Sequence, residues 1–147
     1  MNRTIATLIA GLLAAPVFAD GHASGDAAAG EKAFNKCKSC HMIVADDDTE
    51  IVKGGRTGPN LYGIVGRQAG TIEGFRYGDD LVAAGEAGLV WDEANFVEYV
   101  QDPRAFLRAY LDDSKARSKM SFKLRDGGAD VYAYLASVGP AEEAATN

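Results

Sequence analysis

The apolar residues near the end of the chain recur with the period of an α-helix. Val131, Tyr134, Leu135 and Val138 stand at i, i+3, i+4 and i+7, a spacing that places four side chains on one helical face. We therefore predict a helix over about 129–138.

Two earlier helices are predicted from their start signals. Asp92 precedes one amphipathic stretch, and Asp102 followed by Pro103 precedes the next. An Asp side chain caps the free N–H groups of a first helical turn, and Pro fits the first helical position because no N–H partner is needed there. The apolar residues that these two helices turn inward are Phe96, Tyr99, Val100, Phe106, Leu107, Tyr110 and Leu111.

The first helix of the folded domain is predicted to start at Asp26, another good N-cap, and to run into a pair of cysteines. Gly30, Ala33, Phe34 and Cys37 would then share one helical face.

Residues 42–77 lack any sustained hydrophobic period. They are rich in Gly and polar side chains, and only the stretch NLYGIV suggests a turn of helix. Loops of this length are unusual unless something central organises them. A short helix is expected next, from Asp79 or Asp80 to about Ala87. Because the chain shows no convincing strand and about five helices, the predicted fold class is all-α.

The N-terminal residues have the organisation of a secretory signal. Arg3 supplies a positive charge, residues 5–15 form an apolar run, and small residues precede a cleavage point. The apolar run is too short to anchor the chain across a bilayer. We predict export to the periplasm, cleavage after about Ala19, and one folded domain over 20–147 in which residues 140–147 fray.

Composition and charge narrow the class of protein. The 147-residue chain is 47% hydrophobic and carries a formal net charge of −6, which becomes −7 when Arg3 leaves with the signal. An acidic chain argues against nucleic acid as a partner, because phosphate binding needs a basic surface. Export implies an oxidising compartment, in which two cysteines could form a disulfide.

The only two cysteines stand in the pentapeptide CKSCH, as Cys37 and Cys40, directly before His41. A disulfide across so short a gap would stabilise the fold very little, because it removes little entropy from the unfolded chain. A thioredoxin-like redox pair would need a βαβ pattern, which the sequence lacks. A zinc site needs four protein ligands, or three and a water, and the only soft candidates are the two cysteines, the adjacent His41 and His22. One covalently bound haem fits every feature, with thioether bonds from both cysteines and an iron bond from His41.

The second axial ligand of the iron follows by elimination. Met1 leaves with the signal, Met42 is too close to His41 to reach the other side of the ring, and His22 lies in a Gly/Ala/Ser-rich segment. Met120 remains, in a polar stretch where a core-filling side chain is not expected. We predict His41 and Met120 as the axial haem iron ligands.

The order and spacing of six motifs resemble those of the class I c-type cytochromes, in particular bacterial cytochrome c2, a relative of mitochondrial cytochrome c. The motifs are GEKAFNKCKSCH, TGPNLYGIVGR, GFRY, LVWDEANFVEYVQDP, SKMSF and DVYAYLASV. The segments between His41 and Pro59 and between Pro103 and Met120 are longer than in the mitochondrial proteins. The resemblance implies the class I cytochrome c fold, in which helices and long Gly-rich loops wrap around one covalently bound haem.

The resemblance also implies roles for single residues. Pro59 would accept a hydrogen bond from His41, and the hydroxyl of Tyr99 would approach the sulfur of Met120. Phe122 would lie beside the exposed haem edge. The residues implied to bind the haem propionates are Arg67, Tyr77, Trp91 and Ser118, and those implied at the contact between the terminal helices are Gly30, Phe34 and Tyr134.

A haem with two protein ligands has no free position for a substrate, so we predict a soluble one-electron carrier and not an enzyme. By resemblance, it would shuttle electrons from a cytochrome bc complex to a photosynthetic reaction centre or a terminal oxidase or reductase. Two alternatives stay open: an enzyme or gas sensor with a weak Met120 bond, and a haem subunit dedicated to one oxidoreductase.

Basic residues gather around Met120. Residues 104–125 carry seven Lys or Arg against two Asp, a local charge of +5 on an acidic chain. Together with Lys36 and Lys38 beside the cysteines, Lys119 and Lys123 predict a basic rim at the haem edge, where a monomer would dock an acidic redox partner.

Overall fold

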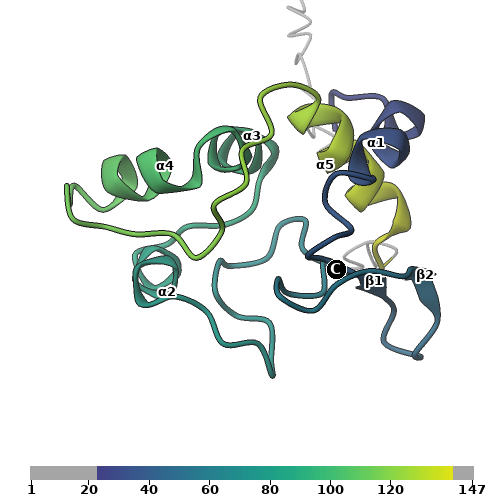
Figure 1. The fold of residues 1–147 in the computed structure, drawn as a ribbon, viewed down its shortest axis with the longest axis horizontal. Helices are drawn as coiled ribbons and strands as arrows, with labels where there is room; N and C mark the ends of the chain where they lie inside the picture. The colour runs from purple at the N-terminus through teal and green to yellow at the C-terminus, as the bar shows by residue number, and fades with distance from the viewer. Residues whose placement is uncertain (1–22, 141–147) are drawn as a thin grey trace, which may run out of the picture.

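A computed structural model describes residues 23–140, which form five helices and two short strands (Figure 1). The elements are α1 (Ala27–Phe34), β1 (Ile43–Val44), β2 (Glu50–Val52), α2 (Asp79–Glu86), α3 (Glu93–Gln101), α4 (Pro103–Tyr110) and α5 (Gly128–Val138). The predicted signal, residues 1–19, and most of the predicted frayed tail lie outside the described residues. The described part confirms the all-α class, and it has a helix at each of the five predicted places.

The terminal helices α1 and α5 cross at one end of the molecule (Figure 1). Gly30 allows this close approach, because a Cβ there would overlap the carbonyl oxygen of Asp130 and lie 2.8 Å from Cβ of Tyr134. The rings of Phe34 and Tyr134 pack with centroids 5.7 Å apart. The predicted contact between the terminal helices is therefore confirmed.

The middle helices begin where their capping residues predict. Asp92 accepts a hydrogen bond from the N–H of Asn95 at the start of α3, and Asp102 accepts one from the N–H of Ala105 at the start of α4. Pro103 occupies the first turn of α4. α3 packs against both α5 and α4, and α4 also contacts α2, so these helices connect the α1–α5 pair to the other end of the molecule.

Tyr110 was predicted to face inward from α4, and the structure corrects this. Phe106 and Leu107 are buried, but Tyr110 is 38% exposed. Its ring stacks on Phe106 with centroids 5.7 Å apart. The end of the apolar face of α4 is therefore left partly in solvent.

The prediction that α1 runs into the cysteine pair was also wrong. The α-helix ends at Phe34, and the cysteines lie on the turns that follow it. These turns are closed by hydrogen bonds from the N–H of Cys37 to the carbonyl of Phe34, at 2.8 Å, and from the N–H of His41 to the carbonyl of Cys37, at 3.0 Å.

The antiparallel pair of β1 and β2 was not predicted. Ile43 pairs with Val52, and the register is irregular beyond that pair. Asn60 holds the other edge of β1, because its side chain accepts from the N–H of Val44 at 3.0 Å and donates to the carbonyl of Val44 at 2.7 Å. The rest of 42–77 is loop with turns at 62–66, as predicted. None of the described helices has the length and apolar character needed to cross a membrane.

Replacing Gly30 with Ala tests the crossing of the terminal helices. Ala favours a helix over Gly, yet Gly30→Ala should lower the free energy of unfolding by about 1–3 kcal/mol, because the added methyl group forces α1 and α5 apart. Chemical denaturation measures this difference. Gly128→Ala is the control, since a Cβ there has its nearest contacts at an ordinary 3.4 Å. A Gly30→Ala variant as stable as Gly128→Ala would contradict the packing described here.

Candidate haem site

A cavity of about 350 Å³ lies between the CKSCH turns, the loop that follows β2, helix α3 and the segment around Met120. Its volume is in the range of small-molecule and cofactor sites. Most of the lining is apolar or aromatic, including Leu61, Ile64, Phe75, Leu81, Trp91, Phe96 and Val131. The predicted site residues Cys37, Cys40, His41 and Met120 all line this one cavity.

The ring of His41 is fixed by Pro59. Its Nδ1 lies 2.8 Å from the carbonyl oxygen of Pro59. A carbonyl only accepts, so Nδ1 must donate, and Nε2 keeps its lone pair for another partner. Burial lowers the pKa of His41, against an opposing effect of the Pro59 bond, and the ring is therefore neutral near pH 7. Neutral imidazole with its other nitrogen held by a carbonyl is the usual state of a metal-binding histidine.

Glycines bring the loop against the CKSCH turns. A Cβ at Gly58 would overlap the His41 ring and lie 2.6 Å from its Nδ1, and one at Gly54 would overlap the His41 carbonyl oxygen. Backbone hydrogen bonds also join the loop to these turns. The N–H of Gly55 donates to the carbonyl of Lys38 at 2.9 Å, and the N–H of Gly58 donates to the carbonyl of Cys40 at 2.8 Å. The sequence reading missed these glycines, although the cluster GGRTG carried the signal.

Cys37 and Cys40 are both free thiols in the structure. Burial raises the pKa of Cys37 to about 11. Cys40 is exposed, and hydrogen bonds from Thr57 and Ser39 lower the pKa of its thiol. Within residues 23–140 no three His, Cys, Asp or Glu side chains gather closely enough to hold a metal ion. Both cysteines line the cavity.

Met120 is half-buried and packs against the hydrophobic core. The neighbouring Ser118 places its Oγ 3.3 Å from the hydroxyl of Tyr99. That hydroxyl was expected to approach the Met120 sulfur, and in this structure Ser118 is its hydrogen-bond partner. Burial raises the pKa of Tyr99, against the bond to Ser118, so the phenol is neutral at physiological pH.

Three of the four predicted propionate-binding residues, Tyr77, Trp91 and Ser118, line the cavity. Arg67 is exposed and lies outside the residues that line the cavity, with its Nε donating to the carbonyl of Gly63 at 3.1 Å. Propionate binding by these residues stays a prediction. Phe122 lines the cavity and is 42% exposed, as expected of an aromatic residue at an open edge.

Of the four lysines of the predicted basic rim, two line the cavity and two do not. Lys36 and Lys119 are exposed and line the cavity, whereas Lys38 and Lys123 are exposed but do not line it. Lys123 instead pairs with Asp102, with 2.6 Å between Nζ and Oδ2. Lys119 donates to the carbonyl of Arg76 at 2.9 Å.

The residues present fit one covalently attached haem. Two free thiols stand at the edge of an apolar cavity, a neutral imidazole offers Nε2, and a thioether side chain stands in the same wall. Gly58 leaves room for the flat face of the imidazole. A neutral imidazole nitrogen and a neutral thioether sulfur are both suitable ligands for haem iron.

The sequence of this chain is similar to those of several bacterial cytochromes c. The chain is 74% identical over 139 residues to cytochrome c-551 of Roseobacter denitrificans, covering 94% of this chain and 96% of the relative. It is 60% identical over 138 residues to cytochrome c2 of Rhodobacter capsulatus, covering 94% of this chain and 97% of the relative. No protein-family model matches the chain.

Solved structures agree with these sequence matches. The structure of cytochrome c2 from Rhodobacter capsulatus superposes with a TM-score of 0.76 at 62% identity, covering 78% of this chain and 98% of that one. The X-ray structure of ferric cytochrome c-550 from Paracoccus versutus superposes with a TM-score of 0.77 at 55% identity, covering 80% of this chain and 100% of that one.

Proposed function

Because this chain belongs to the class I c-type cytochromes of the bacterial cytochrome c2 group, we propose that it is a soluble periplasmic one-electron carrier whose haem iron is bound by His41 and Met120. The family carries one covalently bound haem c, and its members are electron carriers and not enzymes. The axial ligands, the compartment and the partners are the proposal, and the chain's own residues support them.

The observation that carries the proposal is that His41 and Met120 line the same cavity, with His41 held by Pro59. The Pro59 bond fixes the His41 ring in the tautomer whose Nε2 is free to bind iron, and it raises the basicity of that nitrogen. Met120 offers a neutral, soft sulfur, which raises the reduction potential of a haem relative to stronger donors. Cys37 and Cys40 are proposed to hold the haem covalently through their sulfurs.

The bound haem supplies an iron that changes its oxidation state by one electron. The residues of the chain keep the surroundings of that change rigid and dry. Trp91, Phe96 and Leu124 are buried in the cavity wall and exclude water, and Phe122 is the exposed aromatic side chain at its edge. With His41 and Met120 both bound to the iron, the site would offer no position for a substrate.

We further propose export with cleavage after about Ala19, giving one haem domain over 20–147 that works as a monomer. The donor would be a cytochrome bc complex, and the acceptor a photosynthetic reaction centre or a terminal oxidase or reductase. Docking would use the basic rim of Lys36, Lys38, Lys119 and Lys123. The exposure of all four lysines supports this, and Lys36 and Lys119 also line the cavity.

Met120→Ala tests the axial ligand. Removing the sulfur should abolish the weak near-infrared band of ferric haem bound to methionine, lower the reduction potential, and let reduced protein bind carbon monoxide. Absorption spectra and a redox titration measure these changes. Met42→Ala, which removes the methionine beside His41, should leave the band in place. A band that survives in Met120→Ala would show that another residue binds the iron, and carbon monoxide binding by the unaltered protein would favour the sensor or enzyme alternative.

Charge reversal tests the docking surface. Lys119→Glu and Lys36→Glu should each slow electron transfer to an acidic partner severalfold and weaken its dependence on ionic strength, because the attraction that steers association is reduced. Stopped-flow oxidation by purified reaction centre or oxidase, between about 10 and 200 mM salt, measures this. The control is Lys32→Glu, an exposed cation that does not line the cavity. Equal slowing by all three variants would mean that net charge, and not this rim, determines the rate.

A further inference from the structure

The segment that carries Met120 lies between the haem cavity and a second cleft. Ser118, Met120 and Ser121 line the haem cavity, and the same three residues line a second, more polar cleft of about 780 Å³ against α4. On the haem side Met120 packs against the hydrophobic core, whereas on the other side the segment faces the polar cleft. Its position on the cleft side therefore depends on the hydrogen bonds and ion pairs that it makes.

Those bonds are distributed unequally on the two sides of Met120. Before Met120, every residue from 116 to 119 is hydrogen-bonded to a residue elsewhere in the chain. The bonds join Arg108 Nε to the carbonyl of Ala116 (3.2 Å), Asp80 to the N–H of Arg117 (2.8 Å), Tyr99 to Ser118 (3.3 Å), and Lys119 to the carbonyl of Arg76 (2.9 Å).

After Met120, residues 121–123 are all exposed. Of the polar contacts in the described part of the chain, these three residues make the ion pair of Lys123 with Asp102 and no other. The next anchor is Leu124, whose N–H bonds to the carbonyl of Val100 at 2.7 Å and whose side chain is buried.

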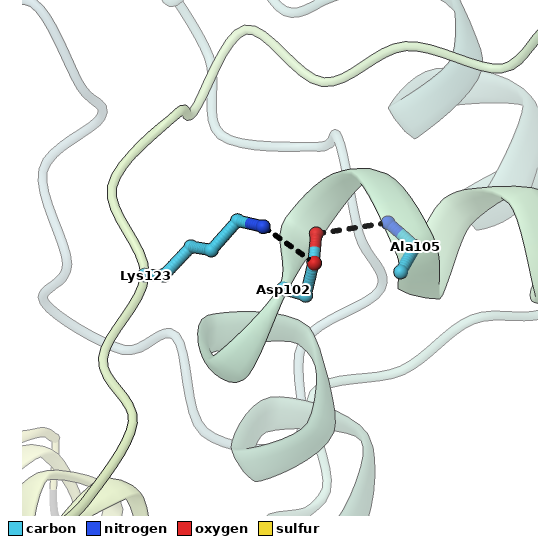
Figure 2. A network of polar contacts seen from close by, with 3 residues as sticks. All are labelled: Asp102, Ala105 and Lys123. Carbon is cyan, nitrogen blue, oxygen red and sulfur yellow. Dashed lines mark hydrogen bonds and ion pairs between the residues drawn. The ribbon is translucent and has the colours of Figure 1, made fainter.

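Asp102 is a rigid anchor because it has two bonds and a buried neighbour. Its Oδ1 caps α4 through the N–H of Ala105, at 3.1 Å, and its Oδ2 receives Nζ of Lys123, at 2.6 Å (Figure 2). Pro103, the next residue, is buried. The bonds from Lys123 and then Ala105 hold the pKa of Asp102 below its usual range, so the carboxylate is charged at neutral pH.

We propose that Asp102 and Lys123 are positioning residues, an ion pair that holds residues 121–123 on the start of α4 and thereby keeps Met120 in the wall of the haem cavity. The inference rests on the proposed role of Met120 as iron ligand. Opening of the pair would free the segment to move toward the polar cleft, so the pair controls how often the iron loses its sulfur.

The rate at which imidazole replaces Met120 on the ferric holoprotein measures this opening. Imidazole is the probe because its neutral form is little affected by a single change of surface charge, and at saturating concentration its binding rate equals the rate of opening. The disappearance of the near-infrared band follows the reaction. Lys123→Gln should raise the rate about two- to fivefold, the factor expected for an exposed ion pair.

Two further variants separate the ion pair from helix capping. Asp102→Asn keeps an oxygen for the N–H of Ala105, since Asn caps helices as well as Asp does, and it should raise the rate by the same factor as Lys123→Gln. The double variant should be no faster than either single variant. Lys123→Arg should restore the original rate, because it keeps a cation within reach of Asp102.

The matched control is Lys115→Gln. It removes the same charge from the same loop, and the Lys115 side chain is exposed with no hydrogen bond or ion pair to any described residue. Its imidazole rate should equal that of the unaltered protein.

The positioning role is overturned if Lys123→Gln and Lys115→Gln react at the same rate, or if the effects of Asp102→Asn and Lys123→Gln multiply in the double variant. A failure of the proposed ligand set looks different. In that case the near-infrared band would persist in Met120→Ala, whatever the behaviour of Lys123.

Discussion

The contact between His41 and the glycine-containing loop is the constraint on which the rest of the site depends. Gly54 and Gly58 allow the loop to touch the histidine, and Pro59 then fixes the ring through its carbonyl, 2.8 Å from Nδ1. Without that close approach, the turns that carry the cysteines would have no wall facing them. The apolar cavity exists because this loop, α3 and the Met120 segment meet around the histidine.

The two iron ligands proposed here are held in different ways, and the difference suits a carrier. His41 is held by backbone groups, through hydrogen bonds that a side-chain change elsewhere leaves in place. Met120 is held in a segment fixed mainly by side chains, among them Ser118 and Lys123. A ligand set that stays the same in both oxidation states needs little rearrangement when an electron moves. Side-chain changes around Met120, and not around His41, can therefore adjust the rigidity of the site.

Local signals predicted the helices, and long-range contacts account for what was missed. The caps Asp92 and Asp102 lie next to the helices they start, so the sequence displays them directly. The short strand β1 pairs with β2 on one edge and bonds to the side chain of Asn60 through Val44, and no alternation in the sequence reveals either contact. Likewise, the sequence showed a basic cluster containing Lys123 but not its partner, which is 21 residues away. The candidate ligands were predictable because two cysteines and three methionines leave few choices.

We propose that the haem organises the loops between β2 and α2 and around Met120, because apolar side chains of these loops, such as Leu61, Phe75 and Phe122, line the haem cavity. Amide hydrogen exchange of the holoprotein, compared with a Cys37→Ala/Cys40→Ala chain that cannot attach haem, tests it most directly. We expect the N–H groups of Gly55, Gly58 and Leu124, all of which are hydrogen-bonded, to be protected in the holoprotein and to exchange freely in the haem-free chain. Equal protection of these three amides in both proteins would contradict it.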